Sequence, residues 1–160
     1  MVVPVTAPRH RSRHDDLLWR EIQPMWPLLA IVVPTLLFII AIAAPVSPAG
    51  LAIGVSIGAL VLVFLGRLVT EVHGDSLRWH FGWVGWPRWQ VDLDDIVAVE
   101  PARSSWANGW GIRATREGML YNSSGTHAVR LVLRDGRRLR LGSQQPQRLV
   151  QALQRRTGTA

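Results

Sequence analysis

The stretch WPLLAIVVPTLLFIIAIAAPVSPAGLAIGVSIGALVLVFLGRLV, residues 26–69, decides the fold of this chain. It consists of two apolar runs joined by the short segment PVSP at 45–48. No charged side chain occurs from Leu28 to Ala44 or from Ala49 to Gly66, and the only hydroxyl groups in these two segments are those of Thr35 and Ser56. A helix with apolar side chains around its whole circumference has no polar face to turn towards water. The stretch therefore favours an apolar environment.

The length of the two runs indicates what that environment is. Each run has about 17–20 residues, and a helix of that length is about as long as a bilayer core is thick. We predict a helical membrane hairpin over residues 25–69, preceded by a flexible cytoplasmic tail over 1–24. The alternative is a buried helical pair in a soluble core, but the rest of the chain has too little apolar sequence to cover two such helices.

Arginines lie on both sides of the hairpin, and none lies in its turn. They are Arg9, Arg11, Arg13 and Arg20 before the first helix, and Arg67 and Arg78 after the second. Basic residues next to membrane spans stay on the cytoplasmic side. We therefore predict two spans in a bacterial inner membrane, with both termini in the cytoplasm. Trp19 and Trp26 suit the cytoplasmic interface, where an indole ring meets lipid while its N–H stays hydrated.

Three glycines repeat every four residues in the second helix, at Gly50, Gly54 and Gly58. Such a stripe lets another helix approach closely, and close packing supplies the attraction between helices in lipid. The partner is either the first helix of the same chain or a second copy of the chain. The second reading would make the protein a homo-oligomer.

Composition limits what the remaining sequence does. The chain has 160 residues, so the hairpin leaves room for one small domain. The net charge is +7 and every basic residue is arginine, but no nucleic-acid-binding motif is present. We therefore predict no nucleic-acid partner. The chain has no cysteine, which excludes disulfides and thiolate metal sites, and we predict no cofactor and no metal.

From residue 70 onward the pattern changes to short segments with period-two alternation, separated by Gly, Asn, Asp and Ser. The segments are 77–81, 89–91, 96–99, 111–115, 119–121, 129–134 and 138–141. The last two flank Asp135-Gly136, a strong hairpin signal because glycine tolerates the positive φ that the turn demands. These segments predict a cytoplasmic domain over 70–160 with about seven strands.

The pattern becomes helical after Leu141. Pro146 fits a first helical turn, and Leu149, Val150 and Leu153 form one apolar stripe. We predict a C-terminal amphipathic helix that closes the sheets. The whole chain is then a membrane α-helical hairpin followed by an α+β, mainly β, domain.

Several of these features occur together in a recognisable order. They are Asp94-Asp95-Ile96 before a strand, the segment 109–113, the strand 128–134, the turn 135–137, and Gly142-Ser143 with Pro146 before the last helix. This order resembles the bacterial pleckstrin-homology-like domains that follow a pair of membrane spans in small bacterial membrane proteins. The likeness covers roughly residues 70–156. It implies two nearly orthogonal antiparallel sheets with the terminal helix plugging one open end.

Tryptophans suggest a first contact surface. Alternation places Trp79 and Trp89 in the core, but it leaves Trp83 and Trp86 in the turn 82–87. Large apolar side chains in an exposed turn indicate a contact surface. They either insert into the bilayer interface, anchor a protein partner, or fold back on the domain. Trp106, in an irregular connection, is a further candidate for partner contact.

Arginines suggest a second surface. If the leucines and valines of 129–134 and 138–141 face the core, four arginines on these strands point outward. They are Arg130, Arg134, Arg138 and Arg140. Such a patch would orient the domain on an anionic leaflet or recruit an anionic partner. The alternative is an ordinary solvated sheet face.

No catalytic pattern is present. His73, His80 and His127 lack metal-ligand spacing, and no nucleophile elbow or phosphate-binding loop occurs. We therefore predict a non-enzymatic, membrane-anchored binding or scaffolding protein at the inner face of a bacterial membrane. Its expected partners are membrane lipid and either another membrane protein or itself. The alternatives are an anionic-lipid-sensing domain and an accessory subunit of a membrane enzyme complex.

Overall fold

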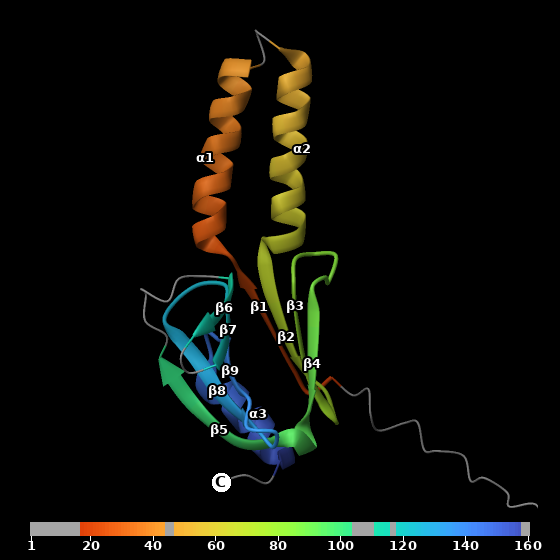
Figure 1. Ribbon diagram of the computed structural model, residues 1–160, viewed down its shortest axis with the longest axis vertical. Helices are drawn as coiled ribbons and strands as arrows, with labels where there is room; N and C mark the ends of the chain where they lie inside the picture. The colour runs from red at the N-terminus through yellow and green to blue at the C-terminus, as the bar shows by residue number, and fades with distance from the viewer. Residues whose placement is uncertain (1–16, 44–46, 104–110, 116–117, 158–160) are drawn as a thin grey trace, which may run out of the picture.

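The computed structural model describes residues 17–43, 47–103, 111–115 and 118–157 (Figure 1). In these ranges the chain forms nine strands, three α-helices and one 3-10 helix. In chain order they are β1 (Trp19–Pro24), α1 (Trp26–Ala43), α2 (Pro48–Leu65), β2 (Arg67–Val72), β3 (Ser76–Phe81), β4 (Arg88–Asp92), η1 (Leu93–Asp95), β5 (Ile96–Arg103), β6 (Gly111–Thr115), β7 (Gly118–Asn122), β8 (His127–Leu133), β9 (Arg138–Gly142) and α3 (Pro146–Thr157).

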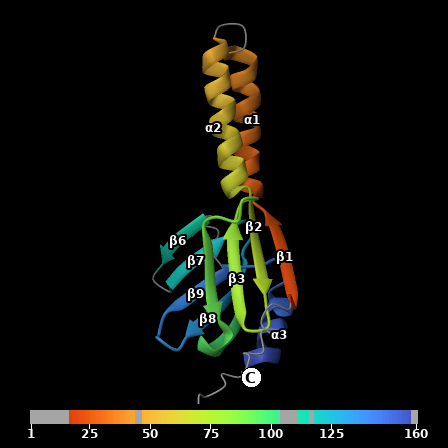
Figure 2. The ribbon, with the colours of Figure 1, turned by 90° about the vertical axis from the view of Figure 1, so that its right-hand side faces the viewer.

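The strands form two sheets, which confirms the α+β class. Sheet A has the order β1-β2-β3-β4 and sheet B the order β5-β8-β9-β7-β6. Figure 2 shows sheet A face on, with its strands running from the hairpin to the opposite end of the domain. The prediction of purely antiparallel sheets is wrong for sheet B, because β7 pairs with β9 in parallel. The turn at Asp135-Gly136 forms as predicted, with a φ of +82° at Gly136.

Two strands were not predicted. β1 lies within the stretch assigned to a flexible tail, and β2 begins at Arg67, within the stretch assigned to the hairpin. β1 was hidden because two of the residues that it turns inward, Glu21 and Gln23, are polar, so the strand has no apolar alternation. β2 was hidden because it directly continues the apolar run of α2. The β-rich domain therefore begins before the hairpin and not after it.

The hairpin is an insertion between two neighbouring strands. β1 and β2 are antiparallel partners, and their register ends with Pro24 opposite Arg67. One residue further on, the Met25 N–H donates to the Gly66 carbonyl at 2.9 Å. α1 begins at the end of β1, and α2 ends just before β2 begins, so no flexible linker separates the helices from the sheet.

The two helices stand side by side and project away from the domain (Figure 1). A Cβ added at Gly58 would lie 2.5 Å from Leu36 Cδ2, and one added at Gly54 would lie 3.1 Å from Ile39 Cγ2. These two glycines therefore pack against α1 of the same chain. Gly50 instead contacts the side chain of Ser47, whose hydroxyl accepts from the Gly50 N–H at the start of α2.

The two helices differ as candidate membrane spans. α2 is the one helix in the described ranges that is long and apolar enough to cross a membrane, by length and composition. The apolar part of α1, Trp26–Ile42, falls short of that length. Of the two predicted spans, only α2 is therefore long and apolar enough to cross a membrane, among the described residues.

The domain has one hydrophobic core that joins both sheets and α3. Leu68, Leu77 and Phe81 come from sheet A, and Leu131 and Leu141 come from sheet B; all five are essentially inaccessible. The predicted apolar stripe of α3, formed by Leu149, Val150 and Leu153, is buried against the same cluster. The C-terminal helix thus packs on the core as predicted.

Two polar side chains of β1 form buried hydrogen bonds with other parts of the domain. The Glu21 carboxylate accepts from the Ser143 hydroxyl and from the Gln144 N–H, both at 2.7 Å. The Gln23 amide donates to the Gly142 carbonyl at 2.9 Å and accepts from the Ser123 hydroxyl at 3.0 Å. Because Glu21 and Gln23 are buried, these bonds satisfy groups that would otherwise be costly to bury. They fasten β1 to sheet B and to the start of α3.

Candidate functional site

The loop 82–87, between β3 and β4, packs on the end of α2. The Trp83 N–H donates to the Val63 carbonyl and the Gly82 N–H donates to the Arg67 carbonyl, each at 2.8 Å. Val63 lies in the last turn of α2, where a carbonyl has no partner within the helix. Gly82 has a φ of +70°, which only glycine adopts at little cost, so its place in this turn has a backbone reason.

The two tryptophans of this loop contact the helix end and remain exposed. The Trp86 ring meets Phe64 edge to face, with 6.2 Å between the ring centroids. The Trp83 ring lies under the Arg67 guanidinium, at 5.0 Å, and against Gly66, where an added Cβ would be 2.5 Å from the ring. Trp83 is nevertheless 56% exposed and Trp86 66% exposed. They neither fold into the core nor stand free of the helix.

Other apolar side chains are exposed at the same end of the hairpin. Trp26, the first residue of α1, is 62% exposed, and Val84, at the tip of the loop, is exposed as well. We call Trp26, Phe64, Trp83 and Trp86 the aromatic collar. Tryptophan favours the boundary between lipid and water, because its ring is apolar and its N–H is a donor. The collar has the composition of such a boundary.

The other predicted tryptophans fall into two groups. Trp79 is buried as predicted and meets Tyr121 edge to face, at 5.2 Å between centroids. Trp89 is half-buried against the same core, 4.9 Å from Tyr121. Trp106 lies outside the described residues, as do residues 109 and 110 of the segment 109–113; residues 111–113 belong to β6.

The predicted arginine patch does not form as one open surface. Arg140 is only 6% exposed, so the prediction that it points into solvent is wrong. It lies on β9 in the interior of sheet B, directly between Leu120 on β7 and Arg130 on β8. Arg130 is half-buried and lies 3.7 Å from Glu100. Arg138 is exposed, as predicted.

Arg134 belongs to a different feature, a cavity at the end of the domain farthest from the hairpin. Its terminal amino group donates to the Asp94 carbonyl at 2.9 Å. The cavity has a volume of about 520 Å³ and is open to solvent. Its lining residues are Gln90, Val91, Asp92, Asp95, Leu133, Arg134, Asp135 and Arg137. We call it the distal cavity.

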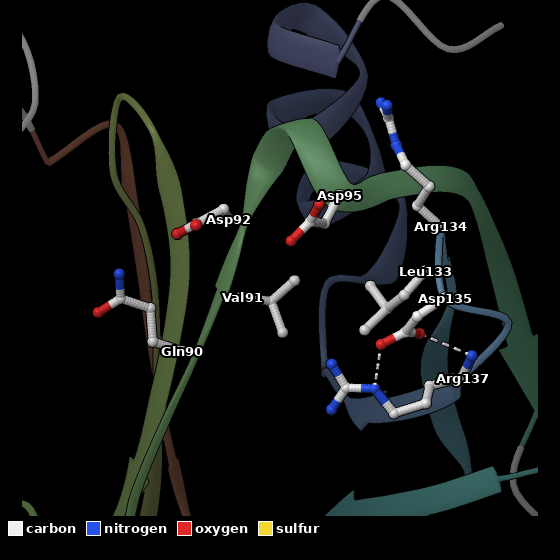
Figure 3. Close-up of a pocket in the computed structure, with 8 residues that line it drawn as sticks. All are labelled: Gln90, Val91, Asp92, Asp95, Leu133, Arg134, Asp135 and Arg137. Carbon is white, nitrogen blue, oxygen red and sulfur yellow. Dashed lines mark hydrogen bonds and ion pairs between the residues drawn. The ribbon is translucent and has the colours of Figure 1, made fainter.

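The distal cavity lies between the two sheets and is mixed in charge. Figure 3 shows Val91 and Asp92 on one side and Leu133, Asp135 and Arg137 on the other. Asp135 accepts hydrogen bonds from the backbone N–H and the guanidinium of Arg137, and these bonds hold the pKa of the Asp135 carboxyl below its usual value. This ion pair shapes one wall, so the cavity suits a polar partner with its own charges.

A second hollow, of about 420 Å³, lies at the base of the hairpin between α1 and β6. Its lining is apolar and includes Leu28, Ile31, Phe81 and Ile112.

Among the described residues, no group of three His, Asp or Glu side chains could hold a metal ion. No protein-family model, no curated protein and no solved structure matches this chain.

Sequence reasoning identified Trp83 and Trp86 but missed Arg67 as part of the same site. Arg67 was recognised only as a charge that marks topology. Its contact with Trp83 depends on the pairing of β2 with β3, which brings the start of one strand beside the end of the other. The distal cavity was missed as well, because its two walls are about forty residues apart in the chain.

Proposed function

We propose that this chain is a membrane-anchored, non-catalytic binding protein. In this proposal α1 and α2 both cross the inner membrane of a bacterium and hold the β-rich domain against its cytoplasmic face. The observation that carries the proposal is the insertion of the apolar hairpin between β1 and β2. These strands are hydrogen-bonded neighbours, so the start of α1 and the end of α2 lie side by side. If α1 enters a bilayer, α2 must therefore leave the bilayer on the same side.

Helix packing supports two crossings. α1 and α2 have 18 residues each, or about 27 Å at the α-helical rise per residue. α1 packs beside α2 at Gly54 and Gly58, so a bilayer that surrounds one helix also reaches the other. The large apolar side chains on both helices are mostly exposed, which is unfavourable in water and favourable in lipid.

The orientation is supported by charge. Arg67 directly follows α2, and Arg20 precedes α1 on β1, near the end of that strand away from the helix. The segment 45–48 between the two helices has no charge. Under the positive-inside rule the domain then lies in the cytoplasm. The aromatic collar would lie at the lipid–water boundary, with the loop 82–87 in contact with the leaflet.

The distal cavity supports a binding role. It opens at the end of the domain that points away from the hairpin, where a cytoplasmic partner would reach it. Because β2 follows α2 with no linker, the distal cavity would stay at a fixed distance from the membrane. Binding in the cavity would then concentrate a partner at the membrane surface. We further propose a pleckstrin-homology-like fold, supported by two sheets whose shared core is closed by a C-terminal helix.

Cysteine chemistry tests this function directly, because the chain has no cysteine of its own. Ser47→Cys places a thiol at the tip of the hairpin, and Val97→Cys places one on the exposed surface of β5. In intact cells a membrane-impermeant maleimide should label the first variant and not the second, and the protein should resist extraction by alkaline carbonate. Release by carbonate, or labelling of Val97→Cys from outside the cell, would overturn the proposal.

A photo-crosslinking amino acid tests the binding role. Placed at Asp95 in the distal cavity, it should capture a partner in native membranes. The matched position is Val97, which is exposed on β5 but does not line the cavity. Equal capture from both positions would show that the cavity has no special part in binding.

A further inference from the structure

Arg67 and Arg88 lie on the same face of sheet A, beside the aromatic collar. Successive residues of a strand alternate between faces, so Arg67 shares a face with Val69. Val69 is opposite His80, and His80 is opposite Arg88. Both arginines therefore flank the loop 82–87 on the face of the sheet that is turned away from the core.

The loop holds both guanidinium groups in place. The Arg67 Nε donates to the Gly82 carbonyl at 3.3 Å, and the Cζ of the same guanidinium lies over the Trp83 ring, 5.0 Å from its centroid. The Arg88 Nε donates to the Gly85 carbonyl at 3.4 Å. Each contact uses the Nε–H and leaves the two terminal amino groups of the guanidinium as further donors. These groups suit a phosphate, which guanidinium binds through paired N–H donors.

In the described ranges, no carboxylate lies within ion-pair distance of Arg67 or Arg88. Other arginines do have acidic partners: Arg20 lies 3.2 Å from Glu71, and Arg137 pairs with Asp135. The uncompensated charges therefore lie at the end of the domain from which the hairpin projects.

We infer that Arg67 and Arg88, framed by Trp83 and Trp86, bind the phosphate of an anionic phospholipid in the leaflet that the hairpin enters. The inference rests on the proposed membrane anchoring. A lipid is favoured over an acidic protein segment because the site is at the end of α2, where exposed tryptophans already require an apolar neighbour. Neither of the two arginines belonged to the predicted arginine patch.

The test uses the full chain in nanodiscs made from a mixture of phosphatidylcholine and phosphatidylglycerol. Lipids retained after gentle detergent extraction are identified by native mass spectrometry. The wild type should retain phosphatidylglycerol in preference to phosphatidylcholine, and the preference should fall as salt concentration rises. Each of Arg67→Gln and Arg88→Gln should lower it about fivefold, the ratio that corresponds to about 1 kcal/mol per basic residue near an anionic leaflet.

The matched control is Arg138→Gln. It removes one charge, as each test variant does, from an exposed arginine at the start of β9, and it should leave the preference unchanged. An equal loss in this variant would overturn the site, because it would show a response to net charge alone. Inorganic phosphate should not displace the retained lipid at equal concentration; displacement would identify a free-anion site and overturn the assignment to lipid.

Two further outcomes separate this inference from the proposed function. A wild-type protein that resists carbonate extraction but retains both lipids equally, at low and high salt, would refute the headgroup site and leave the anchoring intact. If a crosslinker placed at Arg88 captured a protein and no lipid were retained, the site would belong to an acidic protein partner. That outcome would also refute the headgroup site. The wild-type lipid measurement needs no variant, so the inference stays testable if a substitution impairs folding.

Discussion

Glu21 accepts a hydrogen bond from the Ser143 hydroxyl at 2.7 Å, although 122 positions separate the two residues in the sequence. Glu21 precedes the hairpin and Ser143 precedes the last helix. The bond therefore joins two parts of the domain that lie on opposite sides of the α1–α2 hairpin in the sequence. It makes β1 an integral part of the fold, although the sequence around it suggests a tail.

The first prediction concerns this bond. Glu21→Ala should lower the free energy of unfolding by about 1–3 kcal/mol, because Ser143 and the Gln144 N–H lose a buried acceptor. Glu100→Ala is the matched control, since Glu100 is exposed and lies 3.7 Å from its arginine partner; its effect should stay within about 0.5 kcal/mol. Urea unfolding of the full chain in detergent, followed by circular dichroism, measures both. Equal effects would show that the buried bonds do not stabilise the domain.

The second prediction uses the register of β1 and β2. Because Pro24 and Arg67 are direct partners, Asn-Gly in place of residues 25–66 should close a two-residue hairpin between the strands. We expect this shortened chain to fold and to give dispersed amide signals in nuclear magnetic resonance spectra. A fragment over 70–160 should not fold, since it lacks β1 and half of β2. A folded 70–160 fragment would contradict the role given to β1.

The third prediction concerns the helix interface. Gly58→Leu should separate α1 from α2 and cost about 1–3 kcal/mol, because the new side chain would overlap Leu36. Ser56→Leu is the control, as Ser56 is exposed on α2 two positions away. Thermal unfolding in detergent distinguishes the two variants. If Gly58→Leu changed the oligomeric state and left the melting temperature intact, the glycines would instead pack between copies of the chain.

The fourth prediction concerns pH. Burial raises the pKa of Tyr121 above its ordinary value of 10.0, and the charge of Arg137 opposes this in part. The folded domain thus holds the phenol proton more tightly than the unfolded chain does. This contribution to stability is complete below pH 10.0 and is lost as the pH rises through the folded pKa.

The composition of the chain makes this titration easy to follow. Tyr121 is the only tyrosine, and the chain has no lysine or cysteine, so no other side chain titrates near that pH. Phenolate absorbance should appear at a higher pH in the folded protein than in denaturant. The melting temperature should fall over the same interval, and Tyr121→Phe should remove most of that fall. A phenolate transition at the same pH in both states would contradict the prediction.

The fifth prediction concerns the aromatic collar. A spin label on Val84→Cys, at the tip of the loop 82–87, should be accessible to oxygen and protected from a water-soluble relaxation agent in nanodiscs. A label on Val97→Cys should show the reverse, although Val97 is also an exposed valine. Power-saturation spectroscopy measures both positions. Equal accessibility at the two positions would show that the loop does not reach the lipid.

The seven strands predicted in 70–160 correspond to β3–β9, and apolar and polar residues alternate most clearly in β3 and β8. β1 could not be found in this way, because the hydrogen-bond partners of the buried Glu21 and Gln23 are 122 and 100 positions away in the sequence. The burial of Arg140 was equally hidden, since it depends on β7 lying parallel beside β9. Local periodicity predicts strands, but it does not predict which strand lies next to which.

The candidate site divides along the same line. The position of Trp83 and Trp86 in a turn left open whether they are exposed or fold back on the domain, and the structure shows them exposed. Their contacts with Phe64 and Arg67 depend on tertiary packing. The same holds for Gly54 and Gly58, which are compatible with two partners until the position of α1 is known. Ligand and partner identity stay predictions.

The order of β1, hairpin and β2 has a consequence for biosynthesis. The ribosome releases β1 first, yet the partner of β1 is made only after both helices have been completed. During that interval β1 has no strand to pair with. An unpaired strand edge favours aggregation. If both helices enter a membrane, as proposed, their insertion would therefore time the completion of the β-rich domain. A delay in insertion would first expose the unpaired strand β1.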